Sequence, residues 1–77
     1  MKINYDKVAD AIYFTLSSDK VEKSVRMNDQ LVVDISKEGN VIGIELLDAS
    51  SKQGAELEKN IRQGVPINII SGTPVAA

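Results

Sequence analysis

The sequence predicts an α+β fold, namely an antiparallel β-meander of about five strands with one C-terminal helix packed on its apolar face. Two observations lead to this prediction. Five short segments alternate apolar and polar residues with the period of two that is typical of half-buried strands, and turn residues separate them. One segment with helix-capping signals then follows. The chain has 77 residues, which is enough for a single small domain with one core.

The predicted strands are defined by their alternation. In the second strand, Ile12, Phe14 and Leu16 alternate with more polar side chains. The five predicted ranges are 2–5, 11–17, 21–27, 31–36 and 40–48. Because the apolar positions of each range fall on one side, we expect a sheet with one apolar face and one polar face.

The lengths of the predicted turns fix an expected register. A two-residue turn at Glu38 and Gly39 joins the last two strands, since glycine readily adopts the positive φ of a tight hairpin. This turn pairs Ile35 with Ile42, Val33 with Ile44 and Leu31 with Leu46. Turns at 28–30 and 18–19 pair Met27 with Leu31, Val25 with Val33, Leu16 with Val21 and Ile12 with Val25. We therefore expect the strands to be neighbours in sequence order, with the fifth at a sheet edge.

The polar face of this sheet carries the candidate functional residues. The register places Tyr13, Ser24, Asp34 and Gly43 in one row, and Arg26 and Glu45 in the next. The candidates for binding a partner or a ligand are Tyr13, Arg26, Asp34 and Glu45. The carboxylates of Asp34 and Glu45 fit an acid–base pair or a cation site. They are better explained as solvated residues of an open sheet face, whose negative charge Arg26 partly offsets. Tyr13 fits cross-strand packing and a partner-binding anchor equally well.

Two further carboxylates, Asp6 and Asp10, flank the first predicted turn. Asp side chains in turns commonly accept hydrogen bonds from nearby backbone N–H groups. We therefore expect both to act locally and not as ligands.

After residue 49 the pattern changes to that of a helix. Ser50 and Gln53 fit a capping box and Gly64 fits a helix stop, which predicts a helix over residues 51–63. Its apolar stripe is thin and consists of Ala55, Leu57 and Ile61. Gly54 weakens its first turn, so we expect the helix to cover the apolar face of the sheet incompletely.

An apolar tail, residues 65–77, follows the domain formed by residues 1–64. Within the tail, residues 67–70 (INII) fit a sixth strand at a sheet edge. This strand would pair either with the fifth strand or with another subunit, and the sequence leaves both open.

The amino-acid composition limits the kinds of binding and catalysis that the protein can perform. The net charge is −2 and the charges are interspersed, which disfavours nucleic-acid binding. The absence of Cys and His excludes thiolate and imidazole chemistry, so we expect no catalytic residues, no metal site and no cofactor. No apolar run approaches the ~20 residues of a membrane helix, and the first residues lack a signal-peptide core. We therefore expect a soluble cytoplasmic protein that does not bind membranes.

Two separated motifs carry a family resemblance. They comprise Tyr5-Asp6, Ala9-Asp10-Ala11-Ile12-Tyr13, Val33-Asp34, Glu38-Gly39 and the run from Gly43 to Ala49. In this order they resemble the bacterial and archaeal domain-of-unknown-function family 2283, over residues 1–50. The resemblance implies a meander-plus-helix fold and no settled activity. It also implies a small accessory protein, sometimes associated with a toxin-like ribonuclease, and hence an antitoxin-like role.

These observations favour a non-enzymatic protein-interaction module that self-associates, as a dimer in the first instance, or binds a protein partner of the toxin-like type. The thin helix stripe, the apolar fifth strand at an edge and the apolar tail motivate this hypothesis. The alternative is a small-ligand-binding protein or enzyme that uses the Asp, Glu and Arg cluster of the open sheet face, together with Tyr13. A nucleic-acid-related regulator is a third hypothesis, which the composition disfavours.

Overall fold

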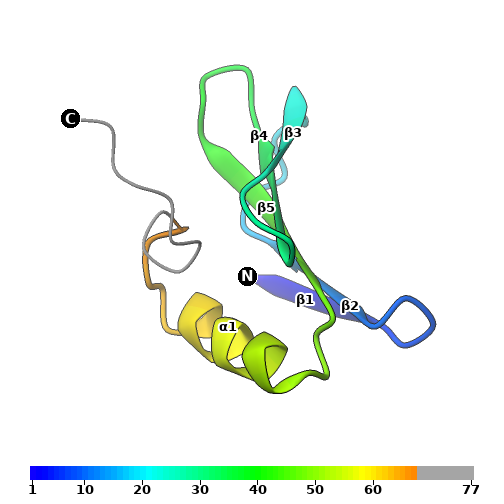
Figure 1. Ribbon diagram of the computed structural model, residues 1–77. Coiled ribbons are helices and arrows are strands. Elements are labelled where there is room, and N and C mark those ends of the chain that lie inside the picture. Colours follow the sequence, from blue (N-terminus) through cyan, green and yellow to red (C-terminus); the bar gives the residue numbers. More distant parts are fainter. Residues whose placement is uncertain (68–77) are drawn as a thin grey trace.

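The computed structural model describes residues 1–67, which form one antiparallel sheet and one helix (Figure 1). The elements are β1 (Lys2–Asp6), β2 (Ala11–Thr15), β3 (Lys23–Arg26), β4 (Leu31–Ile35), β5 (Val41–Leu47) and α1 (Lys52–Arg62). The sheet is twisted and open, and α1 lies against one of its faces. The predicted α+β class is confirmed. Within the described range, no helix is long and apolar enough to cross a membrane.

The strand order is β1-β2-β5-β4-β3, so the expected order is wrong at one point. β2 pairs with β5, with Ile12 opposite Leu46 and Phe14 opposite Ile44, and not with β3. The physical reason is burial, because β5 offers a longer row of apolar side chains than the four residues of β3 (KSVR). β5 is therefore a central strand and not the predicted edge.

The change of partner turns the predicted hairpin at residues 18–19 into a connection. Leu16 and Val21, which were expected to pair, lie outside the strands and are 45% and 43% exposed. The backbone N–H of Leu16 still donates to the carbonyl of Ile42, at 2.9 Å, where the chain leaves the sheet. The sheet edges among residues 1–67 are thus β1 and β3.

The meander β3-β4-β5 has most of the predicted register. Leu31 lies opposite Leu46 and Val33 opposite both Ile44 and Val25. The pairing of Met27 with Leu31 is also confirmed by a backbone hydrogen bond of 2.8 Å. Ile35, however, lies opposite Val41 and not Ile42, because the register shifts after Asp34.

The turn between β4 and β5 accounts for this shift. The N–H of Ser36 donates to the carbonyl of Asn40, which leaves three residues in the loop instead of the predicted two. Gly39 adopts a φ of +89° there, as is common for glycine in a three-residue hairpin loop.

The core lies between the sheet and α1. Phe14, Leu31, Val33 and Leu46 are fully buried on the apolar sheet face. From outside the sheet, Ala49 and Ile61 join them, and Leu57 packs at the margin. The helix thus contributes few core side chains, as its thin stripe predicted.

The helix begins one residue later than expected, with a different cap. Ser51 is the N-cap, and its hydroxyl accepts a hydrogen bond of 2.9 Å from the N–H of Gly54. Ser50, the predicted cap, instead donates its hydroxyl hydrogen to Asp10. The predicted sixth strand at residues 67–70 lies outside the described residues, apart from Ile67. Its expected pairing with the fifth strand is wrong, because β2 and β4 occupy both edges of β5. Its pairing with another subunit and the division of the chain at residue 64 stay predictions.

Candidate functional site

The sheet face opposite α1 carries all four predicted site residues. Tyr13 lies opposite Glu45 on the neighbouring strand, and Glu45 is followed across the sheet by Val32 and Arg26. Asp34 lies in the adjacent row, between Ser24 and Gly43. The expectation that Tyr13 shares the row of Asp34 is wrong, because β2 neighbours β5.

Tyr13 nevertheless reaches Asp34 through its length. Its hydroxyl donates to one carboxylate oxygen of Asp34, and the hydroxyl of Ser24 donates to the other, both at 2.5 Å. The Tyr13 ring crosses Gly43, where an added Cβ would lie 2.6 Å from the ring carbon that carries the hydroxyl. Any side chain at position 43 would therefore displace the Tyr13 ring from this position.

The hydrogen bonds of this network affect the pKa of Tyr13. The hydrogen bond to Asp34, together with desolvation, raises the pKa of Tyr13 to about 12. Each oxygen of Asp34 already accepts an internal hydrogen bond. The network therefore ties β2, β4 and β3 together across β5, and it leaves Asp34 poorly placed to act as a free base or a ligand.

The remaining two predicted residues do not join this network. Arg26 donates from Nη1 to the backbone carbonyls of Asn28 and Asp29, at 3.3 and 3.2 Å, and so holds the turn between β3 and β4. Glu45 is half-buried beside Tyr13. Among the described residues no three acidic side chains converge in the way that a hard cation requires.

A second cluster, centred on Asp10, was missed by the sequence reasoning. Oδ1 of Asp10 accepts hydrogen bonds from the hydroxyl of Tyr5 (2.9 Å) and the N–H of Ser50 (3.1 Å), and Oδ2 accepts from the hydroxyl of Ser50 (2.7 Å). The backbone carbonyl of Asp10 accepts from the N–H of Ala49. We call these four residues the Asp10 joint. It connects the turn after β1 to the turn before α1.

The charge of Asp10 is stabilised by this arrangement. The hydroxyl of Ser50, and then that of Tyr5, lower the pKa of Asp10 by donating to its ionised form. The hydrogen bond between Tyr5 and Asp10 also raises the pKa of Tyr5. The expectation of a local role is confirmed for Asp6, which accepts from the N–H groups of Val8 and Ala9. It is wrong for Asp10, whose partner is forty residues away.

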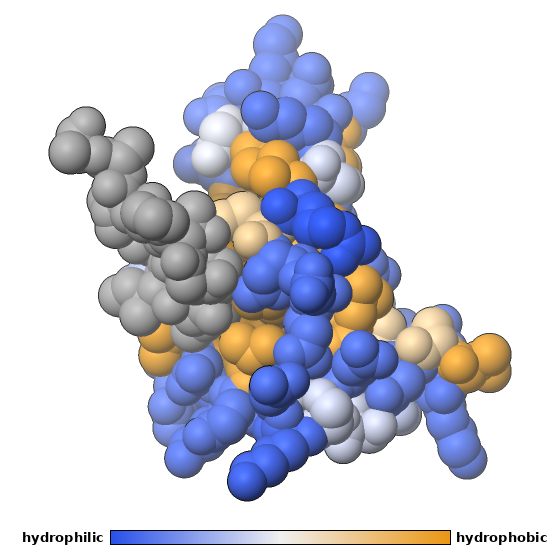
Figure 2. All heavy atoms as spheres, viewed as in Figure 1, coloured by the Kyte–Doolittle hydropathy of each residue, from blue (hydrophilic) through white to orange (hydrophobic). Residues whose placement is uncertain are grey.

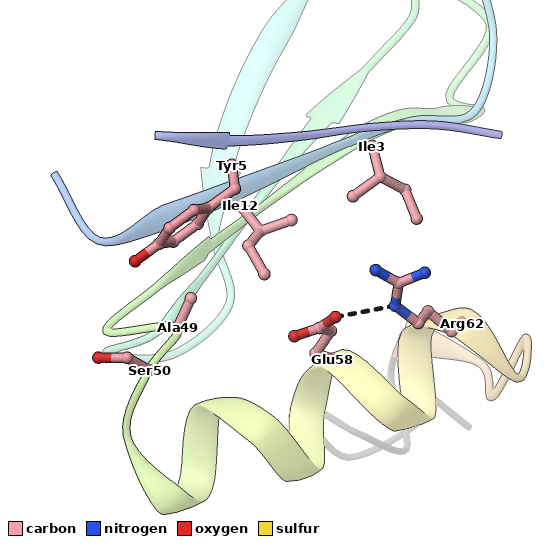
Figure 3. Close-up of a pocket in the computed structure, with 7 residues that line it drawn as sticks. All are labelled: Ile3, Tyr5, Ile12, Ala49, Ser50, Glu58 and Arg62. Carbon is pink, nitrogen blue, oxygen red and sulfur yellow. Dashed lines mark hydrogen bonds and ion pairs between the residues drawn. The ribbon is translucent and has the colours of Figure 1, made fainter. Parts of the chain in front are cut away.

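Beside the Asp10 joint, a groove of about 300 Å³ opens between the sheet and α1 (Figure 3). Its lining comprises Ile3, Tyr5, Ile12, Ala49, Ser50, Glu58 and Arg62. Side chains of β1 extend toward α1, and Glu58 and Arg62 extend from α1 toward the sheet, where they form an ion pair of 2.8 Å. The groove thus has an apolar floor and a charged rim, which is typical of a binding site.

The groove adjoins the free edge of the sheet. Among residues 1–67, β1 pairs with β2 alone, so the outer N–H and C=O groups of β1 have no strand partner. Tyr5, at the boundary between groove and edge, is 51% exposed. The expected sequence-order meander also left the first strand at an edge, so sequence reasoning missed the groove and not the edge. The groove lining combines β1, β2, the turn before α1 and α1 itself, and local sequence patterns do not show that combination.

The comparisons with known proteins gave a family match. A family described as "Protein of unknown function (DUF2283)" matches residues 2–50. No curated protein and no solved structure matches the chain. The matched range runs from the start of β1 to Ser50, so it spans the whole sheet and both sides of the Asp10 joint. Because the match covers more than half of the sequence, the chain belongs to the DUF2283 family.

Proposed function

We propose that the protein is a non-enzymatic interaction module that binds another polypeptide at the edge of β1 and the adjoining groove. The observation that carries the proposal is the continuity of two features, a strand edge that no strand within residues 1–67 covers and an apolar groove beside it. An exposed edge offers main-chain hydrogen bonds to an extended chain, and a neighbouring groove selects its side chains.

The distribution of exposed apolar residues supports the same surface. Among the described residues, Met1, Tyr5 and Val8 are the most exposed large apolar side chains, at 62%, 51% and 100%, and all three belong to β1 or its flanks. The other two, Leu16 and Val21, lie in the connection between β2 and β3. Figure 2 shows apolar surface among hydrophilic residues, including at the turn after β1 on the right of the view. Exposed apolar side chains are a mark of interaction sites where they adjoin a groove, and Tyr5 belongs both to the β1 edge and to the groove lining.

The polar face supports an enzymatic role less well. Its hydrogen-bonding groups are engaged with one another, since Asp34 binds both Tyr13 and Ser24. Arg26, the cation that a negatively charged ligand would need, is directed to a turn. The interaction proposal therefore accounts for more of the structure than a ligand-binding or catalytic role on this face.

The partner is either a second copy or a different protein. A toxin-like ribonuclease is the foreign partner that the family resemblance suggests, and we propose it as the second candidate. The net charge of −2 and the isoelectric point near 4.9 favour association with a basic protein, as a nuclease that binds RNA is expected to be.

Site-specific photo-crosslinking in the native cell tests the proposal. A crosslinking side chain at position 5 reports on the groove, and one at Glu38, in the exposed turn between β4 and β5, serves as the control position. We expect discrete products from position 5 whose masses identify the partner. Products from position 38 alone, or from neither, would contradict the proposal.

A matched pair of charge changes refines this test. Glu58→Lys alters the rim of the groove, whereas Glu56→Lys makes the same change at an exposed position of α1 outside the groove lining. Both variants should fold, since the exposed Glu58–Arg62 pair contributes only about 0.3–0.5 kcal/mol. We expect Glu58→Lys to reduce crosslinking from position 5 and Glu56→Lys to leave it unchanged.

A further inference from the structure

We infer that the occupant of the β1 edge is a second copy of this chain, bound with β1 antiparallel to β1 across a two-fold axis at Asn4. This inference rests on the proposed function and names its partner. The two sheets would then continue through the interface as one sheet, with both helices on the same side.

The sequence of β1, KINYD, is complementary to itself in this register. Around Asn4, the two-fold axis places Lys2 of each copy opposite Asp6 of the other, and Ile3 opposite Tyr5. Opposite charges and aromatic–β-branched pairs are both favourable cross-strand neighbours. Five consecutive residues thus find matched partners in one arrangement.

The two kinds of pair also fall on the correct faces. Ile3 and Tyr5 lie opposite Phe14 and Ile12 of β2, so they face the groove side of the sheet. The charged residues Lys2 and Asp6 lie on the opposite, open face. Apolar contacts would therefore extend the core side, and the ion pairs would form on the solvated side.

Other registers lose these matches. A two-fold axis normal to the sheet places the same face of both copies on the same side. Because side chains alternate between the faces, only registers in which one β1 strand slips by two residues relative to the other preserve this arrangement. One such slip places Lys2 opposite Asn4 and so separates it from Asp6, and the other places Ile3 opposite Lys7. The register centred on Asn4 is the one that pairs every residue of β1.

The other described edge, β3, is not complementary to itself. Its sequence is KSVR, and the two face-preserving self-pairings that keep most of it aligned place Lys23 opposite Val25 or opposite Met27. Both oppose a charge to an apolar side chain. Charge and pattern complementarity therefore assign the second copy to β1.

A charge-swap series read by sedimentation equilibrium tests the inference. In the homodimer, Lys2→Asp and Asp6→Lys each convert two attractive pairs into repulsive ones, and we expect the dissociation constant to rise about tenfold or more. An equimolar mixture of the two variants restores both pairs, so a heterodimer close to wild-type affinity is expected. The double variant should likewise recover, and Lys23→Asp at the β3 edge should change nothing.

Three results would overturn the inference: a wild-type protein that stays monomeric at the highest attainable concentration, single variants that dimerise as tightly as the wild type, or a mixture without recovery. Circular dichroism of each variant checks that the fold is retained. A monomer that still crosslinks from position 5 to a different protein would reject the second copy while leaving the proposed function in place. Absence of both dimer and crosslink would reject the two together.

Discussion

Tyr13 is the residue whose environment is most specific to this fold. Its ring crosses Gly43 and its hydroxyl binds Asp34 on a strand that is not its neighbour. Sequence alternation identified both residues as members of the polar face. It did not show their contact, because that contact depends on β5 lying between β2 and β4.

The first prediction concerns the titration of Tyr13. Its pKa is raised from 10.0 to about 12, so the folded state favours the protonated phenol. The stabilisation is complete below pH 10, and it is lost as the pH rises through the folded-state value. We expect Asp34→Asn to lower the pKa of Tyr13 in a tyrosinate absorbance titration. Because Tyr5 also contributes to the absorbance, the Tyr13→Phe variant is titrated to measure the contribution of Tyr5 alone. An unchanged titration in Asp34→Asn would contradict the hydrogen bond.

The second prediction concerns Asp10, whose pKa is lowered by the hydroxyls of Ser50 and Tyr5. A depressed folded-state pKa stabilises the fold above the ordinary value of 3.8, and this contribution is lost as the pH falls through the folded-state value. Asp10→Asn should therefore destabilise the protein at neutral pH, and the difference from wild type should shrink in acid. Urea unfolding over a pH series measures this.

A matched control for Asp10→Asn is Asp19→Asn, at an exposed position between β2 and β3. It should show little effect at any pH. If the loss of unfolding free energy in Asp10→Asn stayed constant as the pH fell, the negative charge of Asp10 would not be the property that stabilises the Asp10 joint. Sequence reasoning found Asp10 but gave it a local role, since nothing in a turn reveals a partner forty residues away.

At the scale of elements, local patterns located the strands and the helix well. Each observed element lies within two residues of its predicted bounds, and turn lengths gave most of the register from β3 to β5. The partner of β2 was not predictable in this way. Both β3 and β5 alternate, and the choice between them depends on how much apolar area Phe14 and Ile12 bury in the assembled sheet.

The third prediction concerns the start of α1. Gly54 is inside the helix, where alanine is normally about 1 kcal/mol more favourable. Here an added Cβ would lie 2.7 Å from the carbonyl oxygen of Ala49 and would also overlap the carbonyl of Asp48. We therefore expect Gly54→Ala to destabilise the fold by about 1–3 kcal/mol in urea unfolding, as overpacking does.

The exposed neighbour Ala55 provides the control for this prediction. Ala55→Gly should cost about 1 kcal/mol through helix propensity alone. A Gly54→Ala variant more stable than the wild type would show that α1 does not approach the preceding turn as closely as described. Sequence reasoning assigned to Gly54 only its unfavourable helix propensity, because close backbone approach is a tertiary property.

At the scale of the whole molecule, the small size of the chain favours association. A domain of this length buries only about 60% of its unfolded surface, so its stability is modest.

The fourth prediction follows from mass action: if the dimer is more stable than the monomer, the thermal midpoint should rise with protein concentration. Calorimetry of the wild type and of Lys2→Asp measures this, and the variant should show a weaker dependence at equal concentration. A wild-type midpoint that does not depend on concentration would contradict it.

The central claim is that the edge of β1 pairs with β1 of a second copy, and amide hydrogen exchange tests it most directly. Exchange in β1 is compared with exchange in β3, the other described edge, at low and at high protein concentration. The account predicts that protection of β1 rises with concentration while that of β3 does not. Protection that rises at β3 instead, or at neither strand, would contradict it.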